Sequence, residues 1–93
     1  MYTYVKNANG SSRWPRPSTG ESSWLEYWEN ITGKTADHCG ACGKTGRSDL
    51  VGAHVKKVYG GDELYITPLC NSCNQRTDDF FVDTELVRVP NGL

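Results

Sequence analysis

Two Cys-x-x-Cys pairs constrain this chain more than any other feature of its sequence. The pairs are Cys39–Cys42 and Cys70–Cys73, and the 27 residues from 43 to 69 lie between them. A two-residue spacer lets both thiolates of a pair reach one ion, and four thiolates in a tetrahedron are a ligand set typical of structural Zn²⁺. Gly40 and Gly43 give the first pair the backbone freedom that such a turn needs. The sequence therefore predicts one structural Zn²⁺ bound by Cys39, Cys42, Cys70 and Cys73.

Disulfides and a redox-active pair are the alternative uses of these cysteines. Four cysteines allow three disulfide connectivities, but Met1–Asn7 contains no apolar segment that resembles an export signal. We therefore expect a cytoplasmic, reducing location, where paired cysteines are more often metal ligands. A thioredoxin-like motif needs a single pair within a βαβ pattern, which the sequence does not suggest.

Composition supports a metal-dependent fold. The chain has 93 residues, of which 37% are hydrophobic, and its mean hydropathy is −0.61. A domain of this size buries a small core and often needs a metal or disulfides for stability. No apolar run approaches the length of a membrane span. Gly43-Lys44-Thr45 matches the end of a phosphate-binding loop, but His38 replaces the first glycine of that motif, so we expect no nucleotide cofactor.

The first third of the chain predicts an irregular arm followed by a helix. Residues 1–20 contain many turn-forming residues and are expected to form an irregular N-terminal arm, while residues 21–93 are expected to form a single zinc-binding domain. A packing helix is predicted at about 22–32, because Ser23 is a suitable N-cap and Gly33 a suitable C-cap. Its apolar stripe, expected to pack on the zinc domain, consists of Trp24, Leu25, Trp28 and Ile31.

The remaining segments predict a small α+β domain. A turn-rich stretch leads into a strand at 50–55, a turn at 59–62 and a partner strand at 63–67 that Pro68 ends. A helix is expected at about 70–79 and a last strand at about 84–90. A zinc knuckle, a β-hairpin and a short helix in this order, here at about 37–80, form the treble-clef zinc finger.

Within that stretch, the residues from Cys39 to about Thr77 resemble the HNH (ββα-metal) endonuclease superfamily. The matching pattern is Cys-x-x-Cys, an Ala-His-Val strand, and Pro-Leu-Cys-x-x-Cys-Asn. The chain also resembles a group of small uncharacterised bacterial and phage proteins, through Val-Gly-Ala-His-Val and the segment Trp-Leu-Glu-Tyr-Trp-Glu-Asn-Ile-Thr-Gly-Lys.

The HNH resemblance implies a catalytic site separate from the structural zinc. His54 matches the general base that activates water, and Asn74 matches a position that binds a second divalent cation, Mg²⁺ or Mn²⁺. Ala53 and Tyr65 replace the family's other metal-binding residue and its central asparagine. We therefore expect a non-catalytic HNH-like module, with a divergent endonuclease as the alternative. A third interpretation of His54 is a buried histidine in a strand.

Charge distribution suggests a partner only weakly. The net charge is −1, but residues 34–57 carry five basic and two acidic side chains, and the rest of the chain to residue 93 is acidic. Nucleic acid is one candidate partner, a protein is another, and ordinary surface charge is the simplest explanation. Trp14, Trp24 and Trp28 are expected in the core rather than as base-stacking residues. The candidate nucleic-acid-binding residues are Lys44, Arg47, Lys56 and Lys57.

Overall fold

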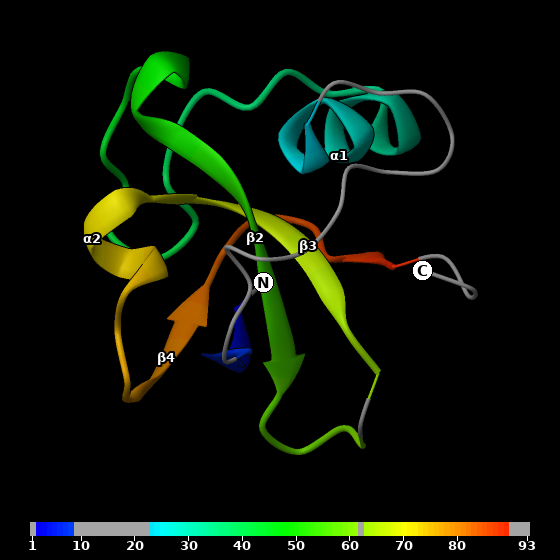
Figure 1. The fold of residues 1–93 in the computed structure, drawn as a ribbon, viewed down its shortest axis with the longest axis vertical. Helices are drawn as coiled ribbons and strands as arrows, with labels where there is room; N and C mark the ends of the chain where they lie inside the picture. The colour runs from blue at the N-terminus through cyan, green and yellow to red at the C-terminus, as the bar shows by residue number, and fades with distance from the viewer. Residues whose placement is uncertain (1, 9–22, 62, 90–93) are drawn as a thin grey trace.

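The computed structural model describes residues 2–8, 23–61 and 63–89. Within them, five antiparallel strands form one sheet in the order β4-β1-β2-β3-β5 (Figure 1). The strands are β1 (Thr3–Asn7), β2 (Leu50–Lys57), β3 (Tyr65–Cys70), β4 (Asp79–Val82) and β5 (Val87–Arg88). The helices are α1 (Trp24–Thr32), α2 (Asn71–Asn74) and the short 3-10 helix η2 (Arg47–Asp49). The small α+β fold predicted from the sequence is confirmed.

Helix α1 has the predicted ends. The Ser23 hydroxyl accepts a hydrogen bond from the Glu26 N–H at 3.2 Å, and Gly33 adopts a left-handed φ of 71°. Trp24 and Trp28 are buried as expected. Ile31, however, is 59% exposed, so its predicted place in the packing stripe is wrong. The buried residues of α1 all lie between positions 24 and 28, so its last turn does not belong to the packed face.

The N-terminal segment is part of the sheet. Thr3–Asn7 forms β1, which pairs with both β2 and β4, and Val5 is fully buried. The prediction of an irregular arm is therefore wrong for these residues. The run Tyr2-Thr3-Tyr4-Val5 is rich in aromatic and β-branched residues, which favour strands. The rest of that arm, residues 9–20 with Trp14, lies outside the described residues.

The predicted hairpin is present but longer than expected. Strand β3 continues through Pro68 to Cys70, and Pro68 lies opposite Gly52 of β2. The Pro68 carbonyl accepts a hydrogen bond from the Gly40 N–H at 2.9 Å. Because the nitrogen and carbonyl of a strand residue point to the same side, the missing N–H of Pro68 faces the cysteine turn rather than β2. Pro68 therefore breaks no bond of the hairpin, and the prediction that it ends the strand is wrong.

The predicted helix at 70–79 is reduced to a single turn. Helix α2 spans Asn71–Asn74, and the Arg76 guanidinium then forms two hydrogen bonds to the Asp78 carboxylate, at 2.9 and 2.6 Å. Strand β4, which was not predicted, begins at the next residue and pairs with β1. Its alternation of exposed and buried positions is the usual pattern of a half-buried strand. Strand β5 lies within the predicted range of the last strand.

Helix α1 packs closely on the sheet because Gly52 has no side chain. A Cβ atom at this position would overlap the backbone nitrogen of Leu25 and the backbone carbonyl carbon of Trp24. Neither backbone atom can move without displacing the helix. The contact of α1 with β2 therefore depends on glycine at position 52.

We predict that Gly52→Ala lowers the free energy of unfolding by about 1–3 kcal/mol, the usual cost of overpacking. The measurement is urea unfolding of the metal-loaded protein, with the exposed substitution Ser48→Ala as control. Equal urea midpoints for the two variants would contradict the close contact between α1 and β2.

Candidate metal centre

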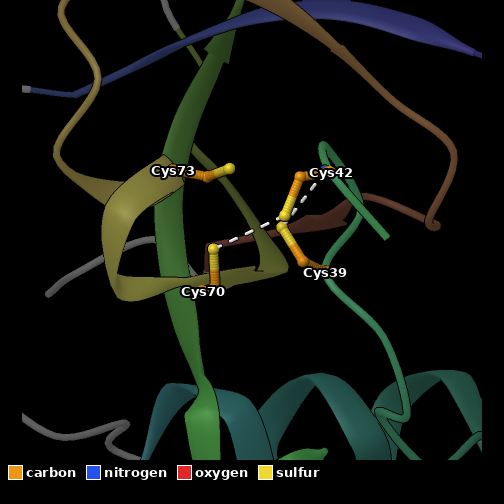
Figure 2. A group of neighbouring side chains, drawn as sticks. All are labelled: Cys39, Cys42, Cys70 and Cys73. Atoms are coloured by element: carbon orange, nitrogen blue, oxygen red, sulfur yellow. Dashed lines mark hydrogen bonds between the residues drawn. The ribbon is translucent and has the colours of Figure 1, made fainter. Parts of the chain in front are cut away.

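The structure brings the four cysteines together, as Figure 2 shows. Their Sγ atoms all lie within 4.8 Å of one another, and the Cys42 and Cys70 sulfurs are 3.6 Å apart. A tetrahedral zinc site with Zn–S bonds of about 2.3 Å has sulfur–sulfur separations of about 3.8 Å. A disulfide would require about 2.05 Å, and all four cysteines are free. The cluster therefore has the composition and spacing of a site that could hold one metal ion.

The first pair is held by a compact turn. The Cys39 N–H donates to the Lys44 carbonyl at 2.8 Å, and the Gly43 N–H donates to the Cys39 carbonyl at 2.9 Å. Gly43 has a φ of 78°, a conformation that side chains disfavour. The Cys42 N–H points at the Cys39 sulfur, 3.5 Å away. The tight turn expected from Cys-x-x-Cys and its glycine is therefore present.

The second pair belongs to the junction between β3 and α2. Cys70 is the last residue of β3, and Cys73 lies in the single turn of α2. The Asn7 side-chain amide donates to the carbonyls of Cys73 at 2.8 Å and Arg76 at 3.0 Å. The N-terminal strand is thereby attached to the loop that contains the second pair.

Burial and hydrogen bonding act in opposite directions on these thiols. Burial raises the pKa of Cys39, but the backbone amides of Cys42, Cys70 and Ala41 outweigh it and lower this pKa to about 7. Burial, with the neighbouring sulfurs, raises the pKa of Cys73 well above its ordinary value. Four thiolates this close would repel one another, and a divalent cation offsets that repulsion.

His54 lies in the middle of β2 beneath helix α1. Its side chain is 2% exposed, and its ring meets the Trp24 ring edge-on, with centroids 5.1 Å apart. Burial lowers its pKa to about 4. The environment of His54 therefore matches the buried strand histidine considered from the sequence.

The structure does not bring His54 and Asn74 to the same side of the sheet. Alternate strand residues face opposite sides, so His54 shares the α1 side with Gly52. Val55 and its cross-strand partner Asn7 face the other side, where the Asn7 amide reaches Cys73 of α2. Asn74 ends that helix, and its buried Oδ1 atom has no hydrogen-bond partner among the described residues.

The four basic residues singled out from the sequence do not form one patch. The Arg47 guanidinium forms two hydrogen bonds to the Glu29 carboxylate of α1, at 2.8 and 2.7 Å. Lys56 and Lys57 are consecutive in β2 and face opposite sides of the sheet. The Lys57 ammonium lies 4.8 Å from the centre of the Tyr65 ring. Lys44 is exposed beside the cysteine turn.

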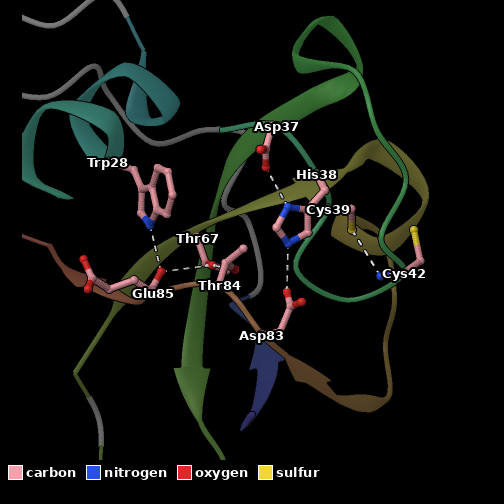
Figure 3. A network of polar contacts seen from close by, with 9 residues as sticks. All are labelled: Trp28, Asp37, His38, Cys39, Cys42, Thr67, Asp83, Thr84 and Glu85. Atoms are coloured by element: carbon pink, nitrogen blue, oxygen red, sulfur yellow. Dashed lines mark hydrogen bonds and ion pairs between the residues drawn. The ribbon is translucent and has the colours of Figure 1, made fainter. Parts of the chain in front are cut away.

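A polar network next to the cysteines was not predicted (Figure 3). The two ring nitrogens of His38 contact the carboxylates of Asp37 and Asp83, at 2.7 and 3.2 Å. The Asp37 carboxylate, assisted by Asp83, raises the pKa of His38. This network borders a cavity of about 480 Å³ whose wall also includes Trp28 and Glu85. The contact of His38 with Asp83, 45 positions away, has no local sequence signal.

Comparison of the chain with protein-family models, with curated proteins and with solved structures gave no match. Among the described residues, every helix is too short or too polar to cross a membrane. The fold and the cysteine cluster therefore define the chain only as a small α+β protein with a candidate metal centre.

The burial of His54 predicts a specific pH dependence. Its pKa of about 4 in the folded state lies below the ordinary 6.5, so between these values the unfolded state binds the extra proton. Acidification through this range should remove up to about 3 kcal/mol of stability. The variant His54→Gln should lack this contribution.

The measurement is urea unfolding of both proteins at several pH values from 7 to 4. Because every other ionisable group is present in both proteins, the difference between the two curves isolates His54. A difference that does not change with pH would contradict the predicted titration of His54.

Proposed function

We propose that the chain is a zinc-dependent binding module, in which one Zn²⁺ bound by Cys39, Cys42, Cys70 and Cys73 holds the fold together. The main support is the meeting of four sulfurs, with spacings close to those of a tetrahedral thiolate site. Zinc supplies no chemistry of its own here, because a site with four protein ligands leaves no open position for a substrate.

We further propose that this module is a treble-clef finger on an HNH-like scaffold. The order of a cysteine turn, the β2–β3 hairpin and a helix with the second pair supports this assignment. The sheet extends beyond that unit through β1 and β4, and α1 covers one side of the hairpin. These additions enlarge the core that a treble clef alone would bury.

We propose a role in binding rather than in cleavage. A general base must reach the proton that it removes, whereas the His54 side chain is buried against Trp24. Burial also lowers the pKa of His54 to about 4, which makes its imidazole a weak base. Ala53, beside it, offers no side-chain oxygen for Mg²⁺. Nucleic acid is the partner that we favour.

We predict that the purified protein contains one Zn²⁺ per chain, and that removing it with a strong chelator abolishes cooperative unfolding. Zinc binding to such sites contributes about 10 kcal/mol or more, comparable to the total stability of a small domain. Native mass spectrometry gives the stoichiometry, and circular dichroism during thermal unfolding gives the cooperativity.

The matched variants for this test are Cys73→Ala and Ser72→Ala. Ser72 is an exposed neighbour of Cys73 in the same helical turn, so its substitution should leave zinc and fold unchanged, whereas Cys73→Ala should lose both. A metal-free protein that still unfolds cooperatively would contradict the proposal.

We also predict that the zinc-loaded protein does not cleave DNA or RNA in the presence of Mg²⁺ or Mn²⁺. The assay uses supercoiled plasmid and a labelled RNA, and excess chelator serves as the negative control. Cleavage that is lost in His54→Ala while zinc and fold are retained would instead establish the divergent endonuclease.

A further inference from the structure

A row of three aromatic rings lies on the outer part of the sheet. The Tyr4 ring is 4.5 Å from the Phe81 ring and 5.9 Å from the Tyr59 ring, measured between centroids. In both contacts the ring planes are inclined by only 30°. Tyr59 is 88% exposed and Phe81 57% exposed, whereas most large apolar side chains of the described residues are buried.

Strand pairing brings these rings together from three separate segments. Tyr4 of β1 lies directly opposite Phe81 of β4, so their side chains share one face of the sheet. The Val58 N–H donates to the Tyr4 carbonyl at 3.0 Å, which places the start of the β2–β3 turn, and therefore Tyr59, beside β1. Strand pairing thus fixes Tyr4 and Phe81, and a backbone hydrogen bond anchors the turn that carries Tyr59.

Two lysines form the next row of the same face. Lys6 follows Tyr4 by two residues and therefore points to the same side, and Lys56 lies directly opposite Lys6 on β2. Asp79 is the other cross-strand neighbour of Lys6. Neither lysine forms an ion pair with another described residue, and like charges placed directly opposite each other destabilise a sheet. An anion bound between the two ammonium groups would remove this repulsion.

A cavity of about 440 Å³ adjoins the two lysines. Its wall includes Lys6, Lys56 and Arg76, and the last of these has its charge partly balanced by Asp78. Helix α1 packs mainly on β2, β3 and β5, so its main contacts do not cover this row of aromatic side chains on β1 and β4. The aromatic and basic rows are therefore adjacent on one accessible surface.

We propose that this surface binds single-stranded nucleic acid through Tyr4, Tyr59, Phe81, Lys6 and Lys56. Unpaired bases stack on exposed rings, and the lysines beside the cavity neutralise the phosphates of the same strand. A duplex cannot use the rings in this way, because its bases already stack on one another. The proposal deepens the proposed function, since it names the partner and the contact surface of the zinc-dependent module. It replaces the basic residues suggested by the sequence, of which it retains only Lys56.

The test measures binding of the zinc-loaded protein to a fluorescent 12-nucleotide DNA strand of mixed sequence, to the matching RNA strand and to the corresponding duplex. Fluorescence anisotropy is recorded at several salt concentrations. We expect both single strands to bind more tightly than duplex. The double variant Tyr59→Ala/Phe81→Ala should weaken single-strand binding at least about fivefold. The double variant Lys6→Gln/Lys56→Gln should reduce the slope of log K against log salt by about 1.4.

Two matched controls accompany these variants. Lys57→Gln removes a charge adjacent to Lys56 but on the other face of the sheet, and Ile31→Ala removes an exposed apolar side chain on α1. Both should bind like the unmodified protein. Cross-linking of a 5-iodouracil-substituted strand should map to Tyr4, Tyr59 or Phe81.

Zinc content and circular dichroism are measured for every variant, so that failure of the surface proposal can be told from failure of the proposed zinc-dependent fold. A folded, zinc-loaded protein that fails to bind single strands, or that prefers duplex, would overturn the surface proposal and leave the zinc module intact. Aromatic and lysine variants that bind single strands as well as the controls do would overturn it too. Cooperative folding without zinc would instead contradict the proposed metal-dependent function.

Discussion

The convergence of four sulfurs joins the turn before β2 to the junction between β3 and α2. The first pair belongs to a turn that leads into β2, and the second pair ends β3 and forms α2. The turn is also attached to the sheet, since the Gly40 N–H bonds to Pro68 and the Gly40 carbonyl accepts from Asp83. A metal ion bound at this point would act on a small core, in which a single lost interaction is a large share of the total stability.

Sequence patterns predicted the features that depend on neighbouring residues. Helix α1 follows from its caps and the cysteine turn from its spacing, because both are decided within about ten residues. Strands β1 and β4 were not predicted, since each is short and is completed by partners far away in the chain, although the aromatic and β-branched residues of β1 favour a strand. The prediction that Pro68 ends the strand was wrong for the same reason. The effect of a proline depends on which side of β3 its nitrogen faces, and that side is occupied by the distant Gly40.

The candidate site shows the same division. Spacing alone identified the four cysteines, but the surroundings of His54 depend on where α1 packs, which no local pattern reveals. Arg47 was named as a candidate nucleic-acid-binding residue, yet its guanidinium bonds to the Glu29 carboxylate, 18 positions away in the sequence. The sheet therefore separates His54, on the side of α1, from Asn74 of α2, the two residues that a nuclease mechanism would have to combine.

The position of β1 between β4 and β2 has a consequence for how the molecule is made. Thr3–Asn7 is synthesised before both of its neighbours in the sheet, β2 and β4, and Asn7 finally bonds to Cys73 and Arg76. Strand β1 can therefore complete its pairing only after β4, which ends at Val82, has been translated. Such long-range pairing slows folding. It also leaves β1 unpaired during synthesis, when exposed strands are prone to aggregation.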